Sequence, residues 1–544
     1  MSLMREIRVQ SPLAMLAATR WGELKTDRAK HERDWQLIAQ LFRPLRKGFG
    51  ADDPASADRA IRPLSSDQIK ALQNFAAGLY GTLTNPTQRW FGFTVPDRDL
   101  ADWHGNRAWL DAVTDRVLAS FGAGTFYDAS LQVYSDLAAF GNAPTYDEVL
   151  PGKGIIDVAL NLAEVCCDID AHGQVNEVVR RYYLTAAQAV ARFGAGAVPP
   201  KLMDLAEKGS RDRFAFYHHV LPNDAWRPGA LGPRGKAWIS RHATEVDHAL
   251  LAQGGYDEMP FYMPRWDVGA GEVYGVGLAG DALPAAQALA RMDDATLRAA
   301  QMAAEPPILA PDRSAFSYNG HIRPGAVIYE GVNMQGNPML RPLDVSGNIG
   351  LTLQDRQAKA EEIRNAFHYQ LMSLAGRTGM TATEVATINE ERLRLWAPYM
   401  GRVQAEYLAR KVQRRFSMLW RNGQLPPPPP EMEGQELRVT YQSGAAQAQR
   451  AAEGNAVLRV VQDIAPLIQM EPRFLERQDP DAMLEALTEA RGAPARVLRS
   501  REQADQIAQA RAQAQQAAAA MQAGQAGAGM MKDLAQAGMM GGAE

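Results

Sequence analysis

The sequence predicts an α+β protein in which helical segments flank a block of strands. Residues 12–46 carry apolar side chains at three- to five-residue spacing, which is typical of a long amphipathic helix. Between residues 144 and 266 the pattern changes to short apolar runs separated by Pro and Gly turns, which is typical of strands. Two further helical segments, 281–303 and 352–374, enclose a stretch rich in Gly, Pro and Asn. No long period repeats along the chain, so neither a solenoid nor a propeller is expected.

Composition is that of a folded chain and excludes several classes of protein. The 544 residues are 46% apolar and 22% charged, so neither a mainly disordered nor a collagen-like chain is expected. The net charge of -4 argues against a protein that grips DNA through many phosphate contacts, which would usually be basic. The two cysteines, Cys166 and Cys167, are adjacent, which excludes a disulfide framework and fits a reducing cytoplasm. The sequence suggests neither a secretory signal nor a transmembrane helix.

Helices are predicted for most of the N-terminal region. The first helix ends near Pro44, and Ser65 or Ser66 caps a second helix that runs through Leu79. The other elements expected before the strand block are a strand over 89–95 and helices near 100–121 and 125–140. Within the strand block, short helices are expected over 185–194 and 199–209.

The C-terminal half is predicted to be helical apart from one small insertion. The segment 308–350 contains brief strand runs, so it is expected to be a β module between two helices. A GRTG break at 376–379 precedes the longest helix, which covers about 382–422 and has a kink expected at Pro398. Beyond it we expect a polyproline spacer over 426–430, a strand over 437–441, further helices, and an Ala/Gln helix from 501 that leads into low complexity.

The sequence contains no complete motif of the enzyme classes considered. GALGPRGK at 229–236 has one residue too many between its glycines for a phosphate-binding loop, so a surface turn is the better interpretation. In GAGEVYGVG at 269–277, Tyr274 interrupts the dinucleotide-binding pattern, which favours a flexible loop. His218 and His219 should point to opposite faces of a strand, and His242 with His248 lacks zinc spacing. No catalytic residue, cofactor or metal is therefore expected.

Several strings, in a shared order, resemble the podovirus-type head-to-tail connector (portal) family of tailed bacteriophages. The resemblance spans roughly residues 10–510, and the last 30 or so residues carry no family string. The strings that carry it include RPLSSDQIKALQNFAAGLYGTLTNPTQRWF at 62–91, GGYDEMPFYMPRW at 254–266, GEVYGVG at 271–277, DALPAAQAL at 281–289, RPGAVIY at 323–329, MTATEV at 380–385 and AEYLARKVQRRFSMLWRNGQLPPPP at 405–429.

The resemblance implies a ring-forming fold in which two antiparallel stem helices carry a small β-rich clip. It also implies a set of domain boundaries. These are a mixed α/β wing or body over 1–280, stem helix 1 over 281–303, the clip over 304–351, stem helix 2 over 352–373, a tunnel loop over 374–381, a long wing helix over 382–425, a helical crown over 426–500, and a C-terminal barrel helix with a low-complexity tail over 501–544.

The function implied is a portal: a ring, usually of twelve subunits, at one capsid vertex. Such a ring is the conduit for double-stranded DNA during genome packaging and ejection, and it docks the terminase and the tail. Further implied partners are the major capsid and scaffolding proteins and the tail adaptor, with assembly in the host cytoplasm, residence in the virion and no membrane contact. The tunnel loop would place Gly376, Arg377, Thr378 and Gly379 around DNA.

The physical pattern is compatible with a ring that is not an enzyme. Closing a ring requires a heterologous interface, and the apolar stripes of the long helices are expected to face neighbouring subunits. A slightly acidic subunit would let a duplex slide. Two alternatives stay open: another structural ring protein of the head–tail junction, such as an adaptor, or a packaging enzyme that acts on nucleic acid. The second would need a P-loop or a carboxylate metal cluster, and neither is found in the sequence.

Overall fold

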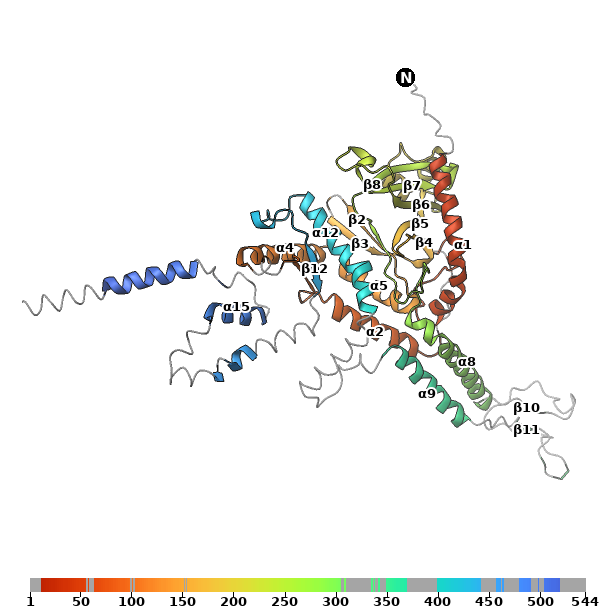
Figure 1. Cartoon of the computed structure of the whole chain (residues 1–544). Coiled ribbons are helices and arrows are strands. Elements are labelled where there is room, and N and C mark those ends of the chain that lie inside the picture. The colour runs from red at the N-terminus through yellow and green to blue at the C-terminus, as the bar shows by residue number, and fades with distance from the viewer. Residues whose placement is uncertain are drawn as a thin grey trace, which may run out of the picture. The chain divides into compact units, whose positions relative to one another are not determined.

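The chain mixes helix and sheet, as the computed structural model in Figure 1 shows, and it divides into two compact units. Unit 1 comprises Met1–Gln88 and Ser120–Arg415, and unit 2 comprises Arg89–Ala119 and Phe416–Glu544. The structure describes residues 11–304 with short gaps within 55–62, 98–102 and 151–153, then 308–309, parts of 334–342, 349–368, 399–441, most of 456–463, 479–490, 498 and 503–518.

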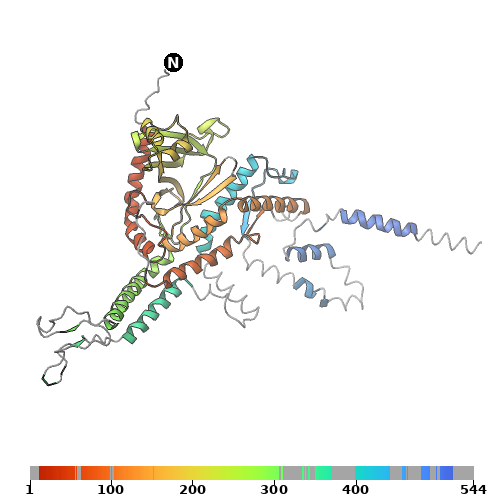
Figure 2. The ribbon, with the colours of Figure 1, turned by 180° about the vertical axis from the view of Figure 1, so that it is seen from behind.

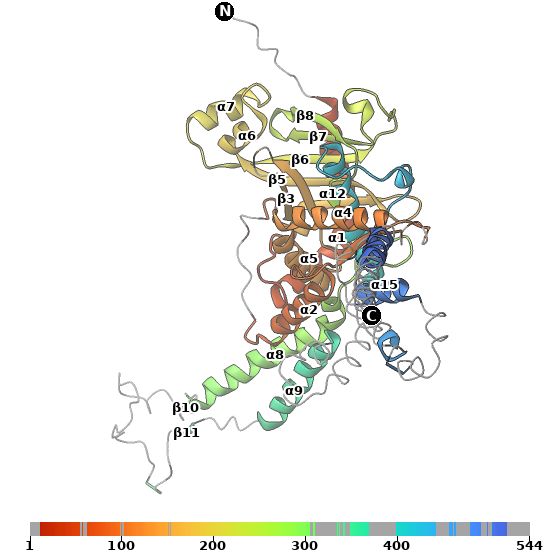
Figure 3. The same cartoon turned by 90° about the vertical axis from the view of Figure 1, so that its left-hand side faces the viewer.

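A five-stranded antiparallel sheet forms the larger layer of unit 1. Its strands lie in sequence order: β4 (Val165–Ile169), β5 (Val175–Thr185), β6 (Arg213–Pro222), β7 (Trp238–Thr244) and β8 (Leu250–Tyr256). Helices α6 (Ala186–Phe193) and α7 (Pro200–Glu207) cover one face, where Leu202 packs in a cluster with Tyr182 and Phe216 (Figure 3). The strand block expected over 144–266 and the two short helices within it are confirmed, and β8 includes Gly254 and Gly255 although glycines favour turns.

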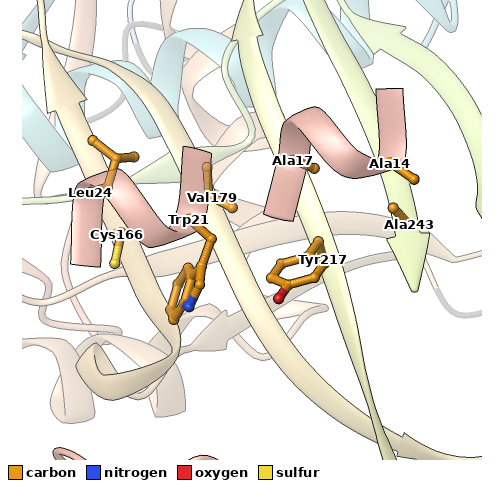
Figure 4. Close-up of a cluster of buried hydrophobic side chains, with 8 residues drawn as sticks. All are labelled: Ala14, Ala17, Trp21, Leu24, Cys166, Val179, Tyr217 and Ala243. Carbon is orange, nitrogen blue, oxygen red and sulfur yellow. The ribbon is translucent and has the colours of Figure 1, made fainter. Parts of the chain in front are cut away.

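Helix α1 (Pro12–Leu41) covers the other face of this sheet. Trp21 and Leu24 pack with Cys166 and Val179 in one buried cluster (Figure 4). Ala14 and Ala17 of α1 lie over Tyr217 and Ala243 in the same cluster. The expectation that the apolar stripe of this helix faces a neighbouring subunit is therefore wrong. The stripe is buried against the chain's own strands.

Arg28 of α1 protects an edge of the same sheet. Its Nη1 donates to the carbonyl oxygens of Leu162, Ala163 and Val165 at 3.2, 3.0 and 3.0 Å, around the start of edge strand β4. Its other side-chain nitrogens bind Glu32, one turn further along the helix. Unpaired carbonyls on an edge strand invite association with other chains. A buried guanidinium satisfies them here.

A second, three-stranded sheet packs against one of two paired helices. It has the order β3 (Gly154–Ala159), β2 (Thr145–Leu150), β9 (Phe261–Tyr262). Helices α2 (Asp67–Leu83) and α5 (Phe126–Phe140) pack against each other, and α5 also contacts β3. The hydroxyl of Ser65 accepts from the backbone N–H of Asp67, which confirms the predicted start of α2.

Unit 2 joins two distant parts of the chain. Strand β1 (Phe91–Thr94) pairs antiparallel with β12 (Arg438–Tyr441). The side chain of Thr440 donates to the carbonyl of Gly92, which lies 348 residues earlier in the sequence. Helix α4 (His104–Gly122) begins in this unit, and the indole of Trp109 donates to the carbonyl of Pro426 at 3.0 Å. Two further helices are α15 (Pro480–Ala490) and an exposed segment over 503–518. Pro398 and the start of the long helix lie outside the described residues.

Candidate functional site

Helices α8 (Leu278–Ala304) and α9 (Ile349–Ala366) form an antiparallel hairpin that projects from the sheets of unit 1 (Figures 1 and 2). Short strands β10 (Ile308–Leu309) and β11 (Arg341–Pro342) pair antiparallel at its far end. The side chains buried in and around this hairpin are mostly small: Ala282, Ala285, Ala286, Leu289, Ala360 and Ile363. Small residues let two helices approach closely. The predicted side-by-side packing of these helices is confirmed.

A glycine-rich segment fixes the point where α8 leaves the body. Gly141 ends α5 with a φ of +70°, and Gly277 lies against it. A Cβ atom on Gly277 would lie 2.5 Å from the Gly141 nitrogen and 2.8 Å from the carbonyl oxygens of Leu137 and Ala138. Of the glycines in GAGEVYGVG, Gly275 and Gly277 therefore serve close backbone packing. The segment is a loop, as predicted, but it is held tightly by the end of α5.

The buried side chain of Asn142 holds this loop through hydrogen bonds. The side chain is fully buried, and its Nδ2 donates to the carbonyls of Phe140 and Gly275 at 2.9 and 2.8 Å. Its Oδ1 accepts from the Gly275 N–H at 2.9 Å. The amide thus pairs with both backbone groups of one residue, as a neighbouring strand would. Because every polar atom of the amide is satisfied, its burial stabilises one loop conformation.

Ion pairs hold the returning helix α9 against α2 and α8. Arg364 lies 2.7 Å from Asp67 at the start of α2, and Arg356 lies 2.6 Å from Asp293 on α8 and 3.6 Å from Asp67. Burial alone would raise the pKa of Asp67, but hydrogen bonds from Arg364 and Ser65 bring it below the ordinary value. An open polar cavity of about 720 Å³ lies beside these residues. We interpret the cluster as an anchor for the hairpin.

Aromatic side chains also hold the end of α9 in place. Phe367, directly after α9, lies 5.7 Å from Phe42 and 6.3 Å from Phe75 between ring centroids. Phe75 in turn meets Trp266 edge-on at 5.6 Å. These separations are typical of favourable aromatic pairs. The end of α9 is therefore fixed to the end of α1 and to α2, and Phe75 connects it to the segment after β9.

The helix that follows at 399–421 is anchored by buried charge. Within α12 (Arg410–Arg421), Lys411 and Arg415 lie 2.5 and 2.7 Å from Asp157, and Arg414 lies 2.8 Å from Asp147. The two aspartates face each other across β2 and β3. Burial would raise the pKa of Asp147, but Lys411 and Arg414 lower it below the ordinary value. Each carboxylate is neutralised by a cation of the helix, so the cluster is structural.

One π-helical turn, Gln404–Ala409, precedes these cations. Within it Glu406 binds Arg265 through both carboxylate oxygens, and the shorter contact is 2.7 Å. The same oxygen that meets Nε also accepts the Arg265 backbone N–H at 3.0 Å. Arg265 reaches the carbonyls of Gly173 and Val273 as well. Glu406 therefore fastens the helix to the loop that leads into α8.

The residues predicted to contact DNA, Gly376, Arg377, Thr378 and Gly379, lie outside the described residues. The hairpin is anchored by residues that the sequence did not indicate, which are Arg356 and Arg364 on α9, Asp67 on α2 and Asn142 after α5. Arg356 and Arg364 are eight residues apart on one helix face, a spacing that could have indicated a shared partner. Nothing local identifies that partner as Asp67, almost 300 residues earlier.

The histidines and the glycine-rich turn that lack an enzyme motif have structural roles. On one face of β6, His219 Nε2 lies 2.7 Å from Glu177 Oε1. On the other face, the ring of His218 stacks on the ring of His242 with 3.9 Å between their centroids. Residues 229–236 form a turn with a short 3-10 helix over Gly232–Gly235, and the residues from 229 to 234 are exposed. The described residues contain no group of three or more His, Cys, Asp or Glu side chains arranged to hold a metal ion. No helix among them is long and apolar enough to cross a membrane.

Comparison with known proteins identifies the class. Residues 14–498 match the model of the family described as bacteriophage head to tail connecting protein. The match covers nearly the whole chain, which therefore belongs to this family, and the resemblance found in the sequence is confirmed.

Two relatives make the comparison more specific. The chain is 29% identical over 517 residues to the probable portal protein of Bordetella phage BPP-1, and 92% of each chain is covered. It is 27% identical over 509 residues to the portal protein of Salmonella phage epsilon15, with 91% of each covered. Among solved structures, a chain of the neck of an empty gene transfer agent particle matches 72% of this chain and 86% of its own, at 13% identity and a TM-score of 0.35.

Proposed function

We propose that this chain is a portal protein, which forms a ring at one capsid vertex of a tailed bacteriophage. The ring is the conduit for double-stranded DNA during packaging and ejection, and it is the platform on which the terminase and the tail dock. The observation that carries the proposal is the family match over 14–498, together with relatives named portal proteins that align over nine-tenths of both chains. The projecting α8–α9 hairpin supports it, because a channel wall needs a long element of this kind.

The domain assignment follows from the same proposal. Helices α8 and α9 are the stem, and the segment between them is the clip exposed outside the capsid. The remaining parts are the wing or body over 1–280, the tunnel loop over 374–381, the long wing helix over 382–425, the crown over 426–500, and the C-terminal barrel helix and tail over 501–544.

The channel constriction is assigned to the tunnel loop. Gly376 and Gly379 give this loop backbone freedom, and Arg377 is its only charged residue. A ring would place one such cation per subunit near the duplex. Affinity for DNA increases with the number of simultaneous phosphate contacts, so single cations touch the duplex without trapping it.

The role is structural, with neither a catalytic site nor a cofactor. The ring, of twelve subunits in the form we propose, assembles in the host cytoplasm and becomes part of the virion. Its partners are the major capsid and scaffolding proteins, the terminase, the tail adaptor and other tail proteins, with double-stranded DNA passing through.

Negative-stain microscopy of the purified full-length chain tests the proposal. We expect rings with a central hole, and class averages should give the subunit number. ATPase and nuclease assays on the same preparation should give no signal above that of a buffer control. A monomeric chain with either activity would overturn the portal assignment and favour a packaging enzyme.

A further inference from the structure

The two edges of the five-stranded sheet differ in how their backbone is protected. At the β4 edge, Arg28 binds carbonyl oxygens that would otherwise be open to another chain. At the opposite edge, β8 has the sequence LLAQGGY, which contains neither a charge nor a proline, the residue types that discourage pairing at an edge. A bulge near Leu250 interrupts the pairing with β7, but Ala252–Tyr256 pair regularly. Among the described residues β8 has no other strand partner, so its outer edge is available to a further strand.

The chain enters helix α1 from this same edge. Ser11, directly before α1, has an extended backbone, and its N–H donates to the carbonyl of His248 at 3.0 Å. His248 lies two residues before the start of β8. Figure 4 shows Ala14 of α1 over Ala243 of β7, the strand next to β8. Residues 1–10, which lie outside the described residues, are therefore joined to the chain at the start of the available edge.

Residues 1–10 have the sequence pattern of a strand. Polar and apolar residues alternate in EIRVQ at 6–10, and the two apolar ones, Ile7 and Val9, are β-branched. Ten extended residues span about 33 Å, which exceeds the roughly 23 Å covered by the seven residues of β8. Because Ser11 lies at the start of β8, a segment that follows the edge away from Ser11 runs antiparallel to β8. With Ser11 opposite His248, Glu6 lies opposite Gln253.

A buried cation beside this edge has no counter-ion among the described residues. Arg241 of β7 is 9% exposed, and its Nε and Nη1 are buried without a hydrogen-bond partner. Its neighbour on β6, His219, binds Glu177, which is also paired with Arg20. Burial lowers the pKa of the Arg241 guanidinium below its ordinary value. A buried charge without a partner is costly, so this position favours an added carboxylate.

Glu6 is the carboxylate that the N-terminal segment can bring there. It is the one acidic residue of 1–10. Gln253, opposite Glu6 in this register, is paired with Arg241 on its other side. Residues in one row across a sheet face the same side, and two strand spacings separate the Cα atoms of Glu6 and Arg241 by about 10 Å. The side chains of a glutamate and an arginine together are long enough to meet across that distance.

The chain's own N-terminal residues fit this edge better than a second copy does. They are covalently joined to Ser11, which is already bonded beside β8, so their effective concentration at the edge is on the order of millimolar. A strand from a second copy would compete with this tethered segment. In particular, β8 of a second copy carries no acidic residue, so edge-to-edge pairing would leave Arg241 without a counter-ion.

We propose that residues 5–10 form a sixth strand of this sheet, antiparallel to β8, and that Glu6 pairs with Arg241. The occupant of the available edge is the N-terminal segment of the same chain. The added strand closes this edge against other chains, as Arg28 does at β4. Because strand and edge belong to one chain, the pairing does not require a ring.

Hydrogen exchange of the full-length chain, followed by mass spectrometry, tests the added strand. Proline has no N–H and interrupts a strand ladder, so I7P/V9P should release the outer edge of β8. We expect the amides of 250–256 to exchange about tenfold faster in this variant, with β5 and β6 unchanged. The matched control I7T/V9T keeps β-branched residues and should exchange like wild type. Wild-type exchange of β8 in the proline variant would overturn the proposal.

Cross-linking tests which chain supplies the strand, in a variant without prolines. I7C/A252C is treated with a short bismaleimide, and the products are separated on a denaturing gel and mapped by mass spectrometry. Cys166 and Cys167 are buried, so the introduced thiols should react first. We expect a link within one chain, and none in the control I7C/H172C, whose second position is an exposed turn at the other end of the sheet. A link between chains would assign the edge to a second copy, and either that result or absence of a link in I7C/A252C contradicts the proposal.

The ion pair is tested by removing its charge. E6Q should speed exchange in β8 several-fold, because Arg241 would again be buried without a carboxylate. R8Q removes a charge from the same segment that has no assigned partner, and it should exchange like wild type. If E6Q and R8Q behave alike, the pairing of Glu6 with Arg241 is wrong.

Discussion

Gly277 illustrates how single residues set the direction of the projecting hairpin. Its hydrogen atom occupies a space where a methyl group would meet the backbone of Gly141, Leu137 and Ala138. Asn142 holds the same loop through three hydrogen bonds, so the first residue of α8 has little freedom. The last glycine of GEVYGVG therefore allows the backbone before α8 to pack closely against the end of α5.

Replacing Gly277 by alanine tests this interpretation. The new Cβ would lie 2.5 Å from the Gly141 nitrogen, and backbone atoms cannot easily move aside. We expect Gly277→Ala to lower the free energy of unfolding by about 3 kcal/mol, as overpacking does. The measurement is the denaturation midpoint of the purified chain.

The control for this experiment is the same substitution in a helix. Gly22 lies in α1 and has no atom within 4 Å of a built Cβ, so Gly22→Ala should raise stability by about 1 kcal/mol. If both variants shift the midpoint in the same direction, the close-packing explanation of Gly277 is wrong.

At the scale of elements, buried charge attaches α12 to the three-stranded sheet. Asp157 has no exposed side-chain surface, and it lies against Lys411 and Arg415, which are also buried. Removing one member of a buried pair costs more than the pair contributes, because the remaining charges stay away from water.

The variant Asp157→Asn should therefore destabilise unit 1 by about 3–5 kcal/mol. Its effect can be measured by the chemical denaturation midpoint. Asp27→Asn is the matched control, because Asp27 pairs with Lys30 on the surface of α1, where 67% of its side chain is accessible. Exposed pairs contribute at most about 1 kcal/mol. Equal losses in the two variants would contradict the role given to the buried cluster.

The five-stranded sheet should respond to mild acid through its stacked histidines. Burial lowers the pKa of His242 to about 3, and the nearby Arg192 and Arg180 act in the same direction. Burial likewise puts the pKa of His218 well below the ordinary value. The unfolded chain therefore binds more protons than the folded chain below the ordinary histidine pKa of about 6.5, and stability falls as pH decreases through this range.

We expect the free energy of unfolding to decrease between pH 6.5 and pH 5, by up to about 1.4 kcal/mol per pH unit for each such histidine, and the unfolding midpoint to decrease with it. His242→Phe keeps an aromatic ring on His218 and removes one titrating group, so its midpoint should depend less on pH in this window. Carboxylates such as Glu177, whose pKa lies at about 2, contribute mainly at lower pH. An unchanged pH dependence in the variant would exclude His242 as a source.

At the scale of the whole molecule, the proposed ring turns single residues into rings of identical groups. In the proposed tunnel loop, Arg377 supplies one cation per subunit around the channel. Substituting such a residue should change contact with DNA while leaving the buried anchors of the hairpin untouched.

We therefore expect Arg377→Ala to form normal rings by negative-stain microscopy but to change the amount of DNA packaged or retained per particle. Arg377→Lys keeps the charge and should behave like wild type. Packaging and retention that are unchanged in the alanine variant would remove Arg377 from the channel site.

The sequence by itself determined the type and order of most elements and the family. Helical and strand periodicities are local properties, so α1, α5, β6 and β7 could be placed from their own residues. The side-by-side packing of α8 and α9 followed from the insertion between them. Family strings are local as well, which is why they could be read without coordinates.

Only the tertiary structure decided which residues meet. The stripe of α1 could equally have faced a neighbouring subunit, and its burial against Cys166 and Val179 depends on where the sheet lies. Lys411, Arg414 and Arg415 can be buried because Asp147 and Asp157 neutralise them from distant strands. The pairing of β1 with β12 also joins segments that share no local signal. Such contacts depend on long-range geometry, since the energy of burying a charge or a backbone edge is set by the partner that arrives there.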